Sequence, residues 1–156
     1  MKITLLVVGS TDSKPIKDLI EDYFQRLKYY IGFEIKTIQP KRKVKQQDSS
    51  ALKKMEAEAI LSHVAESSYL ILLDEKGSSY SSEKFAAFLQ KRLNAGGKEL
   101  IFCIGGAYGF DQSVYQRANT QLALSKLTFT HQMVRLVFVE QLYRAFTILS
   151  GEKYHH

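Results

Sequence analysis

The chain has 156 residues, 45% hydrophobic and 24% charged, which predicts one compact domain over residues 1–156 with a substantial core. Its apolar runs are shorter than the roughly 20 residues that span a membrane, and its start lacks the features of a signal peptide, so we expect a soluble, cytoplasmic protein. The single cysteine, Cys103, excludes a disulfide framework and a cysteine metal site. The net charge of +6 favours a polyanionic partner, with nucleic acid the first candidate.

Strand and helix patterns alternate along the chain. Runs of β-branched and other apolar residues predict strands at about 2–9, 33–38, 69–73, 100–104 and 121–124. Apolar residues at helical spacing, with turn and cap signals, predict helices at about 15–30, 50–65, 82–93, 111–118 and 130–149. Pro15 suits the first turn of a helix, Ser82 is a predicted helix cap, and residues 74–78 are predicted to form a loop.

This order predicts an α/β fold with a mostly parallel open sheet and helices on both faces. Two of the strands, at 69–73 and 100–104, are continuous apolar runs, as expected for central strands covered on both faces. Ligands of such folds bind outside the carboxyl ends of the strands. The loops after residues 73 and 104 are therefore the strongest candidates for a binding site.

The last predicted helix is apolar over nearly its whole circumference. A helix of this kind is covered on all sides, so we expect part of its cover to come from another subunit. Its few polar residues have a regular spacing. His131 and Arg135 share one edge, whereas Glu140, Arg144 and Thr147 fall on roughly the opposite side.

The segment GGAYG, residues 105–109, follows the fourth predicted strand directly. Its glycine spacing and position do not match a dinucleotide-binding fingerprint, and no Gly-Lys-Ser/Thr follows to make a phosphate-binding loop. Two interpretations remain. The loop either packs closely on an uncharged group such as a nucleoside, or its glycines serve only a tight turn from strand to helix.

Four segments together resemble the RlmH type of large-subunit ribosomal RNA methyltransferase, a small member of the SPOUT superfamily. They are KITLLVVG at the start, LLDEKG, IGGAYG and the C-terminal LSKLTFTHQMVRLVFVEQLYRAFTILSGEKYHH. The resemblance implies a C-terminal trefoil knot, S-adenosylmethionine as methyl donor, a homodimer, and methylation at N3 of a pseudouridine in 23S ribosomal RNA of the assembled ribosome. Two alternatives stay open: a SPOUT methyltransferase acting on transfer RNA, and a non-enzymatic factor that binds RNA or the ribosome.

The resemblance also implies roles for individual residues. The donor-binding positions fall on Leu73, Gly105, Leu124, Ser125, Lys126, Leu127, Thr128 and Phe129. His131 is expected to accept a proton or bond the base edge, and Arg135 to stabilise negative charge or bind phosphate. A core or helix-terminal histidine is the alternative for His131. Tyr154 and His155 are expected to complete the catalytic site of the neighbouring subunit. The alternative for the final two histidines is a frayed chain end.

RNA contacts are expected at Arg144 and at the basic run Lys41, Arg42 and Lys43. The alternative for Arg144 is a pair with Glu140 that satisfies itself inside a dimer interface, and the alternative for the basic run is a solvated loop. The family usually has a proline where this chain has Thr130. Thr130 is predicted to cap the last helix instead.

Overall fold

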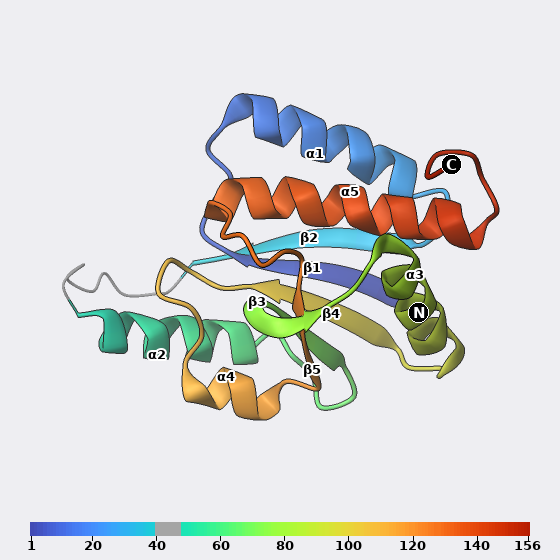
Figure 1. Cartoon of the computed structure of the whole chain (residues 1–156). Coiled ribbons are helices and arrows are strands. Elements are labelled where there is room, and N and C mark those ends of the chain that lie inside the picture. Colours follow the sequence, from blue (N-terminus) through green and yellow to red (C-terminus); the bar gives the residue numbers. More distant parts are fainter. Residues whose placement is uncertain (40–47) are drawn as a thin grey trace.

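The computed structural model describes residues 1–39 and 48–156, and in them five strands alternate with five helices (Figure 1). The strands are β1 (Lys2–Val8), β2 (Gly32–Ile38), β3 (Tyr69–Ser79), β4 (Glu99–Ile104) and β5 (Thr120–Ala123). The helices are α1 (Lys14–Leu27), α2 (Ser49–Leu61), α3 (Ser82–Asn94), α4 (Gln112–Arg117) and α5 (His131–Leu149).

The described strands form one sheet in the order β2-β1-β4-β3-β5, and every neighbouring pair is parallel. The predicted α/β fold with a parallel sheet is therefore confirmed. Because parallel strands point the same way, the part of β3 after Leu73 and the loops after β4 and β5 lie toward the same edge of the sheet. The trefoil knot implied by the resemblance stays a prediction.

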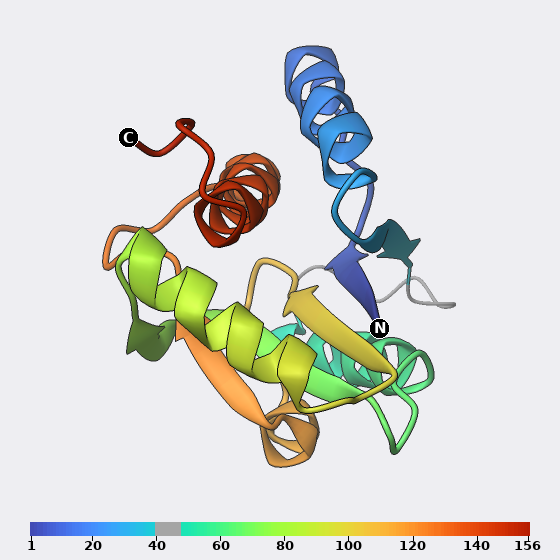
Figure 2. The same ribbon diagram turned by 90° about the vertical axis from the view of Figure 1, so that its right-hand side faces the viewer.

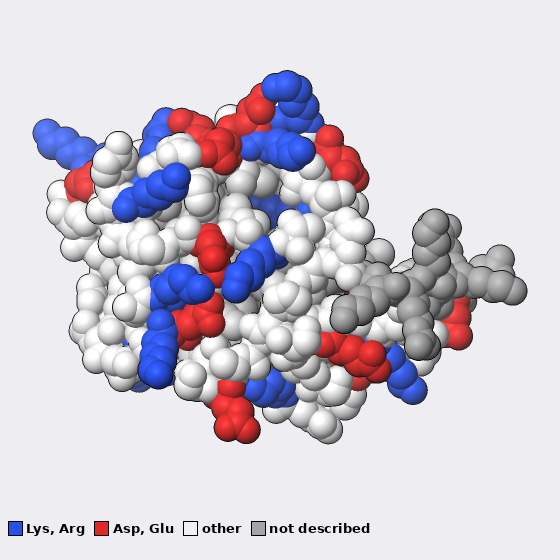
Figure 3. All heavy atoms as spheres, turned by 180° about the vertical axis from the view of Figure 1, so that it is seen from behind, with Lys and Arg blue, Asp and Glu red and all other residues white. Residues whose placement is uncertain are grey.

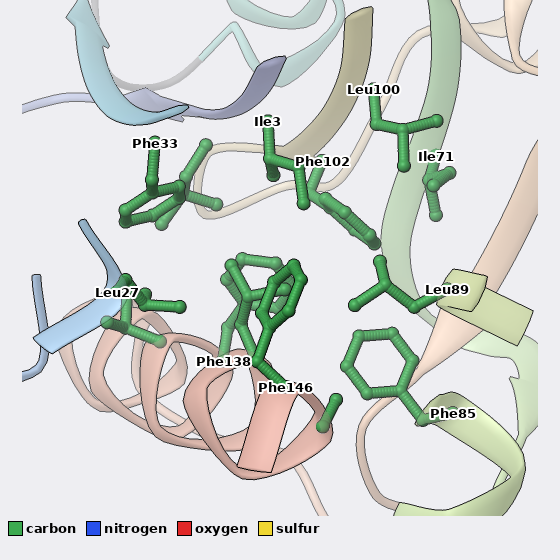
Figure 4. Close-up of a cluster of buried hydrophobic side chains, with 14 of the residues drawn as sticks. Ile3, Leu27, Phe33, Ile71, Phe85, Leu89, Leu100, Phe102, Phe138 and Phe146 are labelled. Carbon is green, nitrogen blue, oxygen red and sulfur yellow. The ribbon is translucent and has the colours of Figure 1, made fainter. Parts of the chain in front are cut away.

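Helices cover both faces of the sheet, as the unbroken apolar strands predict (Figure 1). One cluster of buried side chains joins the sheet to α1, α3 and α5. Figure 4 shows its centre, where the ring of Phe138 on α5 lies 4.7 Å from that of Phe102 on β4. The second cluster joins the opposite face to α2 and α4, and it contains Cys103, which is fully buried as a small apolar residue.

Helix α5 lies between α1 and α3 and buries Phe138, Val139, Leu142, Ala145 and Phe146 against the sheet. Its remaining apolar side chains are only partly covered within the chain, and Met133 is 40% exposed. The helix is therefore not buried on all sides by its own subunit. In the described part of the chain, no helix has the length and apolarity needed to cross a membrane.

Local signals fix the start of several helices. Pro15 lies in the first turn of α1, as predicted. The prediction that Thr130 caps α5 is also confirmed, because its hydroxyl accepts a 3.2 Å bond from the Met133 amide. The predicted cap of α3 is wrong by one residue. Ser81 is the cap, and the hydroxyl of Ser82 instead donates to Gln141 of α5 at 2.8 Å.

The predicted loop at 74–78 is also wrong, because β3 continues to Ser79. The strand pairs with β5 through Leu73 and again through Ser78, both opposite Leu122, with an irregular segment between them. Gly77 makes this close approach possible, because a Cβ atom there would lie 2.5 Å from backbone atoms of Gln121 and Leu122. The polar sequence of this extension resembles a loop, which is why periodicity did not reveal it.

Candidate functional site

The irregular segment of β3 after Leu73 and the loops after β4 and β5 converge on one open pocket of about 960 Å³. This volume lies within the range of small-molecule sites in proteins. Most of the residues predicted to bind the donor line this pocket, and His131 lines it as well. These donor positions are Leu73, Gly105, Leu124, Ser125, Leu127, Thr128 and Phe129. The remaining donor position, Lys126, belongs to the same loop but is not among the described residues that line the pocket.

Each glycine of the 105–109 loop has a reason within the protein itself. A Cβ atom on Gly105 would lie 3.0 Å from the ring of Phe110, and one on Gly106 would lie 2.4 Å from a carboxylate oxygen of Glu56. Gly109 has a φ of +80°, a backbone conformation that other residues rarely adopt. The loop is therefore a tight turn shaped by its own neighbours, and it forms one wall of the pocket.

Hydrogen bonds between loops stabilise the pocket. The Thr128 hydroxyl donates to Glu75 at 3.2 Å, which joins the loop after β5 to the irregular segment of β3. Within the loop after β5, the Leu127 amide donates to the Ser125 hydroxyl at 2.9 Å. Tyr115 of α4 also lines the pocket, and its hydroxyl donates to the carboxylate of Asp74.

The structure separates His131 from Arg135. His131 begins α5, is exposed and lines the pocket. Arg135 is 1% exposed, and its guanidinium donates to the Val8 carbonyl at 2.8 Å and to the Thr11 hydroxyl at 2.7 Å. Burial lowers the pKa of Arg135. This geometry favours a structural role for Arg135 in joining α5 to the end of β1.

A second residue of α5 binds the segment between β1 and α1, and sequence analysis did not identify it. The side-chain oxygen of Gln132 accepts bonds from the amides of Asp12 at 3.1 Å and Ser13 at 2.7 Å. The segment between β1 and α1 is thus fixed to the first turn of α5. Only a signal of long-range pairing could have revealed this contact, because the partners lie about 120 positions apart in the sequence.

The predicted catalytic residues of the tail lie elsewhere in this subunit. The tail turns back beside the end of α5 (Figure 1 and Figure 2). The Tyr154 hydroxyl donates to Glu140 at 3.0 Å, and its ring stacks edge-on against Tyr143 at 4.8 Å. Burial and the neighbouring acceptors raise the pKa of Tyr154. His155 lies between Glu83 at 2.8 Å and Arg144 at 3.2 Å. Neither tail residue lines the pocket of its own chain.

Arg144 is held by groups of its own chain. Its Nη2 lies 2.6 Å from Glu140 in an ion pair that is largely covered, and its guanidinium lies 4.9 Å from the Tyr154 ring centroid. A hydrogen bond to Glu140 is the largest cause of the raised pKa of Arg144. This geometry favours the interpretation in which the pair satisfies itself, and contact with RNA stays a prediction.

The basic run Lys41, Arg42 and Lys43 lies outside the described residues. Together with Lys45 it contains four of the 22 lysine and arginine residues of the chain. On the face shown in Figure 3, described basic and acidic side chains are interspersed. Among residues 1–39 and 48–156, no group of three or more histidine, cysteine or acidic side chains is placed to hold a metal ion.

Comparison with known proteins gives one consistent result. A family described as "Predicted SPOUT methyltransferase" matches residues 1–155. Curated proteins named "Ribosomal RNA large subunit methyltransferase H" are similar over the whole chain. They include proteins of Christiangramia forsetii at 53% identity, Flavobacterium johnsoniae at 49% and Cytophaga hutchinsonii at 48%. Each alignment covers 100% of this chain and at least 99% of the relative.

Proposed function

The chain belongs to the SPOUT methyltransferase family, and from this premise we propose that it methylates 23S ribosomal RNA at N3 of a pseudouridine in the assembled ribosome. The methyl donor in this proposal is S-adenosylmethionine, and the place of action is the cytoplasm. The observation that supports it most is the convergence of the irregular segment of β3 and the loops after β4 and β5 on one pocket. Relatives matched over their full length, with names that specify ribosomal RNA of the large subunit, support the substrate class.

The walls of the pocket suit this donor. S-adenosylmethionine supplies a methyl group on an already activated sulfonium, and it has no phosphate. Leu73, Leu124 and Phe129 offer apolar surface for an adenine ring, and Gly105 contributes to the same wall. The glycine loop has no lysine of the kind that phosphate-binding loops use. Placement of the two reactants is the main contribution that such a site makes to methyl transfer.

His131 is the side chain we assign to the acceptor base. The N3 position of a pseudouridine is a weakly acidic imide, which becomes nucleophilic as its proton leaves. His131 lies on the pocket wall at the first turn of α5, where it can accept that proton or bond the base edge. We expect His131→Ala to retain the donor affinity but to lower turnover by about 100-fold, within the usual contribution of a general base. Unchanged turnover in single-turnover assays would contradict this role.

A homodimer is part of the proposal. The partly covered apolar side chains of α5, with Met133 40% exposed, are available to a second copy. Tyr154 and His155 lie away from the pocket of their own chain, so they would serve catalysis only by reaching the pocket of the partner. Mixed dimers that combine a His131→Ala subunit with a His155→Ala subunit test this arrangement. They should regain activity at one of the two sites.

Ribosomes purified with and without the target pseudouridine distinguish the candidate functions. We expect transfer of labelled methyl groups only to ribosomes that contain the pseudouridine. Equal labelling of both would exclude the proposed target, and labelling of transfer RNA would support the first alternative. Absence of donor binding in calorimetry would support a non-enzymatic factor. Mass analysis of ribosomal RNA from cells lacking the gene should show one missing methyl group.

A further inference from the structure

Glu56 is an acidic residue of α2 that is only 7% exposed. It lies on the side of the sheet occupied by the second apolar cluster, close enough to Cys103 to affect the pKa of that thiol, which burial raises. A buried carboxyl costs free energy unless it is hydrogen-bonded. The Glu56 carboxyl therefore needs a hydrogen-bond partner that offsets the free energy of its burial.

The partner of Glu56 is the backbone of the glycine loop. A Cβ atom on Gly106 would lie 2.4 Å and 2.6 Å from the two carboxylate oxygens, so both oxygens face this residue. Burial raises the pKa of Glu56, and a hydrogen bond from the Gly106 backbone opposes that rise. The loop then closes on itself, since the Gly109 amide donates to the Gly106 carbonyl at 3.2 Å. Glu56 thus contacts the loop at the residue where its turn begins.

We propose that Glu56 is a positioning residue for the donor, because it holds Gly106, and through it Gly105, in the shape that lines the pocket. This inference rests on the proposed function, since it takes the pocket as the donor site. Glu56 itself is not among the residues that line the pocket, so it acts through the loop. An apolar residue at this position would satisfy the core equally well but would leave the loop without its anchor.

Calorimetric titration with S-adenosylmethionine tests the role of the carboxyl. Loss of one hydrogen bond to a buried carboxyl corresponds to about a tenfold rise in Kd, which we expect for Glu56→Ala. Glu56→Gln should stay within about threefold of wild type, because its amide oxygen can accept the same bond. Glu58→Ala is the matched control, since Glu58 is exposed on the same helix. In steady-state kinetics the KM for the donor should rise more than kcat falls.

A double substitution makes the test independent of general destabilisation. Gly106→Ala alone should weaken donor binding, because the new methyl group collides with the Glu56 carboxylate. In the Glu56→Ala background the methyl group has space, so the further effect of Gly106→Ala should be much smaller. Two residues in contact give such non-additive effects. Additive effects, or a folded Glu56→Ala protein with wild-type Kd, would overturn the inference.

Failure of the proposed function has a different signature. If the wild-type protein does not bind S-adenosylmethionine, that function is rejected, and amide hydrogen exchange then decides the role of Glu56. Faster exchange at Gly106 and Gly109 in Glu56→Ala, but not in Glu58→Ala, would support the anchor. Unchanged exchange at both amides would reject it.

Discussion

Replacement of Arg135 by methionine decides between the catalytic role predicted from the sequence and the structural role favoured by its geometry. Methionine has a similar length but no charge and no donor. The substitution removes two hydrogen bonds, to Val8 at 2.8 Å and to Thr11 at 2.7 Å. Hydrogen bonds from a charged group contribute about 1.5–3 kcal/mol each, so the gross loss is about 3–6 kcal/mol.

Part of this loss is offset. The guanidinium is 1% exposed, its Nε has no partner among the described residues, and Arg135 forms no ion pair with a described carboxylate. Removing such a charge releases its desolvation cost. Thr11 is half-buried and can regain a partner from water, whereas the carbonyl of Val8 is left without its donor. The net expectation is a loss of about 1–3 kcal/mol in the free energy of unfolding.

Urea unfolding and single-turnover methylation together test this reasoning. We expect Arg135→Met to show the lower stability and, once folded, less than a tenfold loss of turnover. Lys14→Met is the control, because Lys14 is an exposed cation paired on the surface of α1, and its loss should change stability by less than about 0.5 kcal/mol. Unchanged stability with turnover reduced 100-fold or more would refute the structural role. It would instead support a contact between Arg135 and the substrate.

Two further predictions concern pH and the glycine loop. A hydrogen bond from Lys2 at 2.7 Å lowers the pKa of Glu34 to about 2. Because the folded-state pKa lies below the unfolded value near 4.5, the stabilisation is complete above pH 4.5 and is lost as pH falls toward 2. After allowance for solvent screening, this stabilisation should amount to about 1 kcal/mol. Glu34→Gln should remove this contribution from profiles of the unfolding free energy measured between pH 2 and 6. A profile identical to that of the wild type would contradict the prediction. Gly105→Ala should cost about 1–3 kcal/mol in thermal unfolding, because the ring of Phe110 lies 3.0 Å from the new methyl group, and Phe110→Leu should reduce that cost. An equal cost in both backgrounds would show that the ring is not the obstacle.

The fold could be predicted because its signals are local. The central strands are short apolar runs, and the helices α2, α3 and α5 begin at capping side chains, as Thr130 at the start of α5 shows. The prediction of element boundaries failed where pairing between strands outweighed the local preference of the residues for a loop. The β3 extension to Ser79 is polar and contains Gly77, yet it pairs with β5 because the backbones approach to a distance that only glycine permits.

The site shows the same division between local and distant causes. Helical spacing correctly places His131 and Arg135 on neighbouring turns, but it does not reveal which of them points into a pocket. That outcome depends on the end of β1, which offers the Val8 carbonyl to Arg135, whereas His131 lies beside the pocket formed by β3 and the loops after β4 and β5. One helix edge is therefore divided between a structural contact and a candidate catalytic group.

The glycines of the 105–109 loop show how a ligand-binding surface can arise from internal constraints. The sequence suggested either ligand contact or a tight turn, as if these were alternatives. In the structure Gly105 is confined by Phe110, Gly106 by Glu56 and Gly109 by its own backbone angle, so each is explained without a ligand. The same confinement gives the pocket a fixed wall before any donor arrives, which lowers the ordering cost of binding. The tight turn is thus the physical basis for the proposed binding of the donor.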